Sequence, residues 1–185
     1  MMQKRIYIAG PDVFSPDWPL IAQHAQKVCS DMGFVAELPI PAQPLTGVGI
    51  TSKGDAKTAS AIFKSCIQSI GKSDAIVANL TPFRGVEPDS GTVVECAIAC
   101  ALGIPVIGYA AYKIDPNAYL CAFQNPDGSF VSQEDGYLIE QFGLPFNLMV
   151  AGVCTDFVIG NIESALHKVE AVFRNGVSNT KNPSV

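Results

Sequence analysis

The sequence predicts a single-domain α/β protein with a doubly wound, flavodoxin-like or Rossmann-like sheet that is mostly parallel and flanked by helices. Three observations support this prediction. Short apolar runs rich in β-branched residues alternate with segments of helical periodicity. One run, AIVANL (75–80), is apolar at nearly every position, as expected of a parallel strand covered on both faces. The length of 185 residues suits one well-buried domain and is short for two.

The first half of the chain supplies strands and helices in alternation. RIYIAG (5–10) is predicted to be a strand that ends at a Gly-Pro pair, and PLIAQHAQKVCSDMGF (19–34) a helix that stops at a glycine. VAELPIP (35–41) is a second extended run, followed by a loop rich in glycine and proline. AKTASAIFKSCIQSIGKSD (56–74) is predicted to be a helix that leads into the AIVANL strand.

The alternation continues with the loop TPFRGVEPDSG (81–91), the helix TVVECAIACALG (92–103) and the strand PVIGY (105–109). In a doubly wound sheet, the loops at the carboxyl ends of the strands form the ligand crevice. We therefore expect three loops to line one crevice: Gly10–Phe14, the residues around Pro39, and the loop 81–91.

The last third of the chain is less regular. Residues 112–145 show no periodicity and are predicted to be a long irregular excursion. TDFVIGNIESALHKVEAVF (155–173) begins like a strand and continues as an amphipathic helix. We expect one domain over residues 1–173 and a polar, disordered tail over 174–185, with no internal linker or repeat.

Composition excludes several classes of partner. The formal net charge is -5, the sequence pI is about 4.9, and no cluster of Lys and Arg provides the basic patch that nucleic acid requires. The N-terminus lacks a signal-peptide pattern, and no run approaches the ~18 apolar residues of a membrane span. Only 16% of the residues are charged, which favours a homo-oligomer with an apolar interface.

The six cysteines are expected to be reduced thiols in a cytoplasmic protein. They are scattered, form no CxxC pair, and are accompanied by two histidines that do not complete a metal-ligand set. We therefore expect neither a metal nor an organic cofactor. The cysteines are Cys29, Cys66, Cys96, Cys100, Cys121 and Cys154.

A carboxylate inside the apolar helix 92–103 is the main indication of chemistry. Glu95 lies six residues after Asp89, and this helix has hardly any other polar residue with which it could form an exposed stripe. A buried charge is costly unless it is paired or used, so we expect Glu95 to face a ligand cavity. Asp89 could simply cap the helix. Asp74, directly before the AIVANL strand, is a third acid that could converge on the same space.

Two or three acids around one crevice indicate attack at an acetal-like carbon. One carboxylate then acts as the nucleophile, and another handles the proton of the leaving group.

Two nearby residues have simpler explanations of at least equal weight. Gly10 can form a plain turn as readily as a ligand-approach loop, and no GxGxxG or GxxxxGK[ST] motif is present. Tyr7, inside the first strand, is more often a core residue than a catalytic one.

Three separated blocks resemble the nucleoside 2-deoxyribosyltransferase family. They are IYIAGPDVFSPD (6–17), SDAIVANLTPFRGVEPDSGTVVECAIACALG (73–103) and FGLPFNLMV (142–150), in the family's order. The second block is most similar to the branch that carries a PFRG…EPD.GT..E loop. The resemblance implies a nucleoside deoxyribosyltransferase (pentosyltransferase) of nucleotide salvage that acts on 2′-deoxynucleosides and free nucleobases.

The resemblance implies roles for three catalytic residues. Glu95 falls on the family's nucleophile, which attacks C1′ and forms a 2-deoxyribosyl-enzyme ester. Asp74 matches the acid that protonates or holds the departing base. Tyr7 matches a tyrosine that orients the nucleophile.

The resemblance also implies substrate contacts. Asp89 and Asn147 match groups that bind the sugar hydroxyls, and Gln43, in PIPAQ, falls where the family has a base-contacting glutamine. In the family the Asn-Leu-Met segment reaches into the neighbouring subunit's site, so Asn147 and Met149 would act in trans. Gly10 would let the first loop approach the ligand closely.

The chain departs from the family at three places. Pro41 replaces the Asp of a PLD sequence, and the stretch after Gln43 has no clear counterpart. Ser65 and Cys66 stand where relatives often have Asn. The tail ends in NPSV rather than in the C-terminal tyrosine that some members place in the site. The preference for purine or pyrimidine bases therefore stays open.

Three functions compete. The first is transfer of the 2-deoxyribosyl group by double displacement, with slow hydrolysis as a side reaction and a 2′-OH disfavoured because it would crowd Glu95. The second is hydrolysis of a nucleoside or its 5′-monophosphate. Arg84, Lys53 and the Gly10 turn make no dense phosphate cradle, and Asp89 would repel a phosphate. The third is a nucleoside-sensing module without turnover, for which an unpaired Glu in an apolar helix is unnecessary.

The segment FGLPFNLMV bears on assembly. Read as a core strand, it would bury the amide of Asn147, at a cost of about 1–3 kcal/mol if the amide found no partner. Read as an interface segment, it would bring that amide to a sugar hydroxyl of the adjacent subunit, with Phe146, Leu148 and Met149 sealing the contact. The low charge content favours the second interpretation, and we expect an obligate homo-oligomer, at least a dimer.

Overall fold

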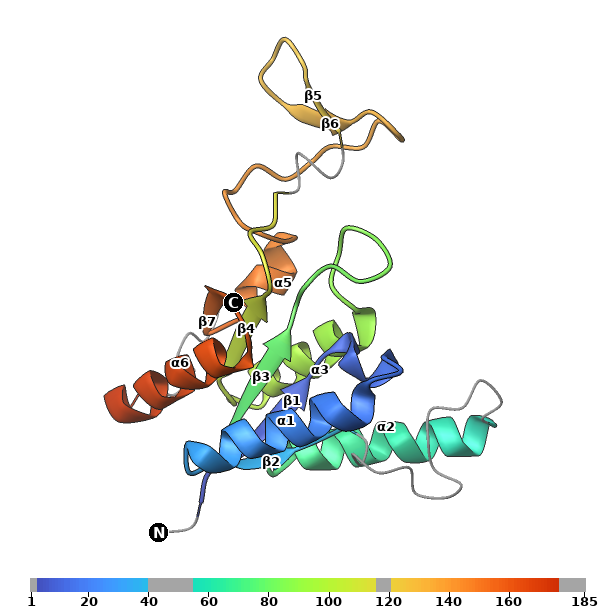
Figure 1. Cartoon of the computed structure of the whole chain (residues 1–185). Coiled ribbons are helices and arrows are strands. Elements are labelled where there is room, and N and C mark those ends of the chain that lie inside the picture. The colour runs from blue at the N-terminus through green and yellow to red at the C-terminus, as the bar shows by residue number, and fades with distance from the viewer. Residues whose placement is uncertain (1–2, 40–54, 116–120, 177–185) are drawn as a thin grey trace.

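The computed structural model of the chain describes residues 3–39, 55–115 and 121–176. These residues form a five-stranded sheet in the order β2-β1-β3-β4-β7, in which every neighbouring pair is parallel (Figure 1). The strands are β1 (Arg5–Ala9), β2 (Val35–Glu37), β3 (Ala75–Asn79), β4 (Val106–Ala110) and β7 (Asp156–Ile159). This is the flavodoxin-like order 2-1-3-4-5, so the predicted fold class is confirmed.

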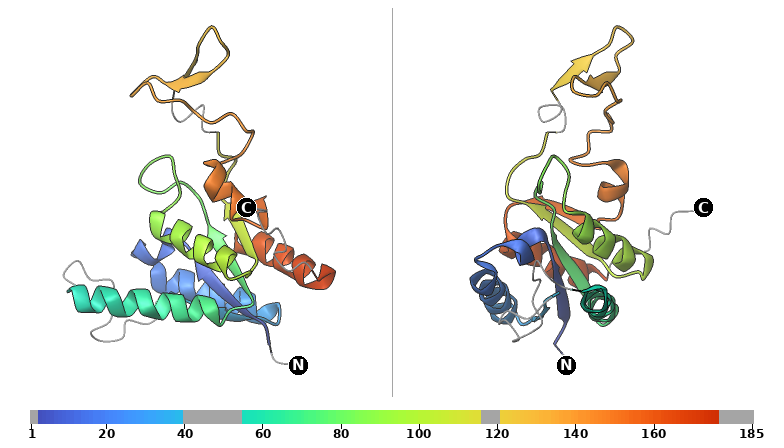
Figure 2. Two further views of the ribbon diagram at one scale, coloured as in Figure 1. Left: turned by 180° about the vertical axis from the view of Figure 1, so that it is seen from behind. Right: turned by 90° about the vertical axis from the view of Figure 1, so that its right-hand side faces the viewer.

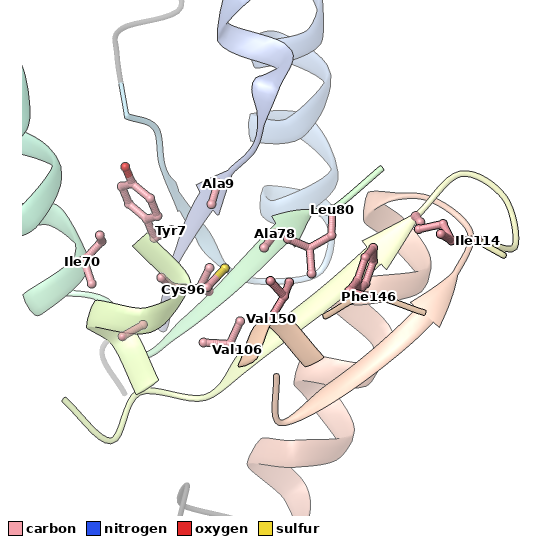
Figure 3. Close-up of a cluster of buried hydrophobic side chains, with 13 residues drawn as sticks. Tyr7, Ala9, Ile70, Ala78, Leu80, Cys96, Val106, Ile114, Phe146 and Val150 are labelled. Atoms are coloured by element: carbon pink, nitrogen blue, oxygen red, sulfur yellow. The ribbon is translucent and has the colours of Figure 1, made fainter. Parts of the chain in front are cut away.

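Helices cover both faces of the sheet (Figures 1 and 2). One face carries α1 (Trp18–Asp31) and α6 (Ile162–Asn175), and the other carries α2 (Ala56–Gly71), α3 (Ser90–Ala101) and the short α5 (Leu148–Gly152). Because side chains alternate along a strand, β1 turns Ile6 and Ile8 toward the first face and Tyr7 toward the second. Figure 3 shows Tyr7 beside Ile70 of α2 and Cys96 of α3.

Short polar side chains fix where three of the helices begin. The carboxylate of Asp55 accepts a hydrogen bond from the Thr58 amide at 2.7 Å at the start of α2. Asp89 accepts one from the Thr92 amide at 2.9 Å at the start of α3. Asn161 caps α6 in the same way. Each cap satisfies an amide that has no partner within its helix, and so sets the register of the apolar face that follows.

A chain of hydrogen bonds ties together the loops at the carboxyl ends of the central strands. Asn79 Nδ2, at the end of β3, donates to Asp12 Oδ2 at 3.0 Å, and Asp12 lies in the 3₁₀ turn η1 (Pro11–Phe14) after β1. Asn79 Oδ1 accepts from the Thr81 amide at 3.1 Å, and Thr81 Oγ1 accepts from the Ala111 amide at 3.1 Å. The loops after β1, β3 and β4 are therefore cross-linked where the strand order reverses.

Between β4 and α5 the chain forms an arm, the described residues 111–115 and 121–147, that extends away from the sheet (Figures 1 and 2). The expectation of an entirely irregular excursion is wrong, because β5 (Ala122–Gln124) and β6 (Phe130–Ser132) form an antiparallel hairpin. Its turn, NPDG, contains Gly128 at φ 90°, a backbone conformation that favours glycine.

The C-terminal end of the described chain extends beyond the expected domain boundary. α6 continues to Asn175, two residues past position 173, and ends at Gly176 in the left-handed conformation. The rest of the expected tail, from 177 on, lies outside the described residues. Within the three described ranges, no helix has the length and apolarity needed to cross a membrane.

A substitution at Gly10 tests the packing of the first loop against β3. A Cβ atom at this position would lie 2.8 Å from Asp12 Oδ2 and 2.9 Å from Asn79 Cβ. We expect Gly10→Ala to separate this pair and to lower the free energy of unfolding by about 1–3 kcal/mol in a urea titration. Gly71→Ala is the matched control, because a Cβ there meets no atom within 4 Å. Equal stability of the two variants would contradict the close packing of Gly10 against Asp12 and Asn79.

Candidate active site

Glu95 and Tyr7 form the centre of the site. Glu95 lies on the second turn of α3, and Tyr7 lies in the middle of β1, 88 residues away in sequence. The Tyr7 hydroxyl donates a hydrogen bond to Glu95 Oε1 at 2.6 Å. Tyr7 is fully buried and Glu95 is partly buried, so the carboxylate is held from the core side.

Opposing influences set the pKa of Glu95. Burial raises its pKa from an ordinary 4.5 to about 7, opposed by the hydrogen bond from Tyr7 and reinforced by the negative charge of Asp89. Burial and the adjacent Glu95 charge raise the pKa of Tyr7 far above its usual range. Tyr7 therefore stays protonated and acts as a hydrogen-bond donor, while Glu95 can change its charge near neutral pH.

Asp89 caps the N-terminus of α3, as its position directly before that helix allows. Its Oδ2 atom accepts hydrogen bonds from both the amide and the hydroxyl of Thr92, at 2.9 and 3.0 Å. It lies near enough to Glu95 for its charge to oppose the ionisation of that carboxyl group. Asp89 thus both caps α3 and borders the site.

The expectation that Asp74 converges on the crevice is wrong. Asp74 directly precedes β3, and in a parallel sheet the start of a strand lies at the edge opposite the crevice. Both carboxylate oxygens are engaged there: Oδ1 with Lys4 Nζ at 2.6 Å and Oδ2 with the Arg5 amide at 2.8 Å. Although burial alone would raise its pKa, these hydrogen bonds hold the pKa of Asp74 below its usual value.

The other expected substrate residues are not gathered around Glu95. Gly10 lies at the crevice edge, where Asn79 and Asp12 leave no room for a side chain. Asn147 and Met149 are exposed at the start of α5, beside a cavity of about 180 Å³ between the arm and the loop after β3, with Asn147 in its lining. Gln43 lies outside the described residues.

Asn147 is not buried in a strand. Its Oδ1 atom accepts a hydrogen bond from the Met149 amide at 2.9 Å as the cap of α5, and its Nδ2 atom donates to Glu140 Oε1 at 2.8 Å. The core-strand interpretation of this segment is therefore excluded.

The sequence-based site did not include an aromatic cluster in the loops that follow β1 and β3. The rings of Phe14, in η1, and Phe83, in the loop after β3, stack with centroids 5.7 Å apart. The guanidinium of Arg84 lies 4.7 Å from the Phe83 centroid and 5.4 Å from that of Phe14. Both stretches were expected to line the crevice, but no spacing rule shows that these rings meet.

Cys66 is a second residue that the sequence did not assign. It lies on α2, half-buried, with its Sγ atom 3.8 Å from the Pro39 carbonyl oxygen, and it opposes the rise in the pKa of Glu95. The only signal in the sequence was its departure from the residue that relatives often carry. Among the described residues, no group of three or more His, Cys, Asp or Glu side chains could hold a metal ion.

The fold and the site together define a class of protein. It is a doubly wound α/β protein with a partly buried carboxylate of raised pKa on the helix that follows β3. A family model described as nucleoside 2-deoxyribosyltransferase matches residues 6–149. The chain therefore belongs to the nucleoside 2-deoxyribosyltransferase family. It is an enzyme of the nucleoside deoxyribosyltransferase type, and the family implies nucleosides and nucleobases as its substrates.

Solved structures agree with this assignment. A 2-desoxiribosyltransferase from Leishmania mexicana is 29% identical with a TM-score of 0.67, over 89% of this chain and 95% of that one. A conserved protein from Enterococcus faecalis V583 is 22% identical with a TM-score of 0.51, over 94% and 99% of the two chains, and supports the fold alone. A comparison with curated protein sequences gave no match.

The raised pKa of Glu95 predicts a stability cost at high pH. The unfolded chain ionises this group at an ordinary pKa, so folding becomes less favourable as pH rises through about 7. We expect Glu95→Gln to gain on the order of 2 kcal/mol in unfolding free energy over the wild type between pH 5 and pH 8. Urea titrations at both pH values measure this, with Glu134→Gln, an exposed acid on the arm, as the control for charge loss. If the difference in unfolding free energy between Glu95→Gln and the wild type is the same at both pH values, Glu95 is not a buried carboxylate that titrates in this range.

Proposed function

We propose that the enzyme transfers the 2-deoxyribosyl group of a 2′-deoxynucleoside between nucleobases through a covalent ester on Glu95, with slow hydrolysis as a side reaction. The observation that carries the proposal is the hydrogen bond from Tyr7 to a partly buried Glu95. We place the reaction in cytoplasmic nucleotide salvage, in keeping with six free thiols.

The proposed reaction is a double displacement. A carboxylate oxygen of ionised Glu95 bonds to C1′ while the C1′–N bond breaks, and its electron pair leaves with the base, which takes up a proton. A ring nitrogen of the acceptor base then attacks C1′ from the opposite face, loses its proton, and returns the electron pair to Glu95. The Tyr7 hydroxyl stabilises the returning negative charge. Water in place of the acceptor gives free 2-deoxyribose.

Asp89 is proposed to bind the sugar, whereas Asp74 has no part in the reaction. Both hydrogen bonds to the Asp89 carboxylate use Oδ2, which leaves Oδ1 to accept from a sugar hydroxyl. We assign no proton transfer to Asp74, because it lies at the opposite edge of the sheet, away from the reacting atoms.

The enzyme is proposed to act as a homo-oligomer with shared sites. α3 turns Glu95 inward but leaves Val94 and Leu102 at least half exposed, and Met149 at the start of α5 is 69% exposed. Monomeric proteins rarely leave large apolar patches uncovered. In the proposed assembly, Asn147 and Met149 of one subunit complete the substrate pocket of the next.

A mass measurement tests the nucleophile. After brief incubation with a 2′-deoxynucleoside and no acceptor, we expect one deoxyribosyl adduct on the peptide that contains Glu95. With deoxyadenosine and a second base, exchange should yield a new nucleoside, and Glu95→Ala should lower its rate by at least roughly 1,000-fold. Glu134→Ala, which removes an exposed acid on the arm, serves as the control. Near-normal exchange by folded Glu95→Ala protein would eliminate the proposed role.

Mixing subunits tests the shared site. Asn147→Ser keeps a capping oxygen for α5 but removes the amide, and Glu95→Ala removes the nucleophile. Each variant alone should be inactive or nearly so. A mixture that exchanges subunits should recover part of the activity, because some pockets receive a Glu95 and an Asn147 from different chains. If mixed oligomers form and no activity returns, the site is not shared.

A further inference from the structure

The arm exposes apolar side chains around a very short hairpin. Beside the three-residue strands β5 and β6, the Ile139 amide donates a hydrogen bond to the Phe130 carbonyl oxygen at 2.8 Å. The Ile139 side chain is buried there, whereas Tyr137 and Leu138 are 76% and 74% exposed. Among the described residues, no helix lies beside this hairpin (Figures 1 and 2). A small hairpin is marginally stable in water unless it packs on a helix or on further strands, so this one needs such a support.

The first half of α2 is a helix segment with little packing of its own. Among residues 56–65, only Thr58 and Ile62 are half-buried, the others are exposed, and the ring of Phe63 lies on the surface. The second half of the helix is anchored by the fully buried Ile70. Figure 1 shows the first half extending beyond α1 and α3. Because packing supplies most of the stability of helices in proteins, a surface that covers this half would stabilise it.

The arm and α2 carry opposite charges. Residues 121–147 contain four acids and neither Lys nor Arg, whereas α2 contains two lysines and no acid. The two lysines are seven residues apart, which is two helical turns, and therefore share one face of α2. That face borders a hollow of about 420 Å³, which among the described residues is lined by Ala56, Lys57, Ser60, Ala61 and Lys64. Small side chains between two cations suit an apolar group that has acids beside it.

The arm and the first half of α2 do not meet within one chain, because they lie far apart in both views (Figures 1 and 2). A second copy of the chain offers each of them its complement. In a two-fold dimer the arm of each subunit reaches α2 of the other, which gives two equal contacts. We infer that the arm packs on the first half of α2 of a second copy, with Tyr137 and Leu138 against the face that carries Lys57 and Lys64. This inference rests on the proposed homo-oligomer.

The contact would also bring the proposed shared residue toward the partner's site. Asn147 lies at the base of the arm, and α2 packs beside α3, the helix that carries Glu95. Figure 3 shows Ile70 of α2 next to Tyr7, and Phe63 lies only about 10 Å further along the same helix. An arm that docks on α2 therefore ends near the carboxylate of the other subunit, as a site shared between subunits requires.

A paired charge reversal tests the contact. The arm variant combines Asp127→Lys, Gln133→Lys and Asp135→Lys, which changes the formal charge of residues 121–147 from -4 to +1. The α2 variant combines Lys57→Glu and Lys64→Glu. Each variant alone brings like charges together at both contacts, so we expect the dissociation constant of the dimer to rise at least roughly tenfold in sedimentation velocity runs.

An equal mixture of the two variants should associate as the wild type does. In a mixed dimer the basic arm meets the acidic α2, and the unchanged arm of the second chain meets the unchanged α2 of the first. The control is Lys27→Glu with Arg174→Glu, which makes the same change in net charge as the α2 variant, but at exposed positions on the opposite face of the sheet. This control should associate normally.

Three results would overturn the inference: a monomeric wild type, reversed variants that each associate as the wild type does, or a mixture of folded variants that fails to associate. Circular dichroism of each variant establishes that it is folded. The proposed function is judged separately, by base exchange in the same samples. If the mixture associates but neither it nor the wild type exchanges bases, the contact stands and the proposed function is wrong.

Discussion

The burial of one ionisable carboxylate is the constraint on which the site depends. Glu95 sits on a helix whose inner face packs on the sheet, and its charge is tolerated there because Tyr7 donates from β1 at 2.6 Å. A fully solvated carboxylate would keep its charge at no cost but would be shielded by water from an electrophilic carbon. A fully buried one would stay protonated. The pKa of about 7 places Glu95 between these limits, so the fold gives up some stability to keep a reactive group.

The polarity of the parallel sheet determines which sequence-based assignments could succeed. Strand and helix order followed from periodicity, and the position of Glu95 followed from the lack of any polar stripe on α3. The error with Asp74 came from treating the two ends of β3 as equivalent, although residues before a parallel strand lie at the opposite edge from those after it. Asp12, which follows β1 and accepts a hydrogen bond from Asn79, lies at the same edge as the loops after the strands, but the sequence-based site did not include it.

Other features depend on contacts that no local pattern encodes. The contact of the Cys66 thiol with the Pro39 carbonyl oxygen, at 3.8 Å, depends on the rotation of α2 about its axis, which is set by tertiary structure. The stacking of Phe14 on Phe83 depends on the conformation of two loops, including a positive φ of 54° at Arg84. The β5–β6 hairpin was missed because its strands have only three residues each, although the NPDG turn is a recognisable signal.

Catalysis and assembly are connected through α3 in the proposed enzyme. This helix carries Cys96 and Ala99 into the core and presents Glu95 to Tyr7, while Val94 and the C-cap residue Leu102 are exposed. A subunit that covers these exposed residues would add favourable apolar burial to the helix that bears the unfavourable charge. Assembly would then offset, on the same element, part of the stability that the buried carboxylate costs. In such an enzyme the isolated chain would be the least stable form, and the position of Glu95 would be best defined where a neighbour packs against α3.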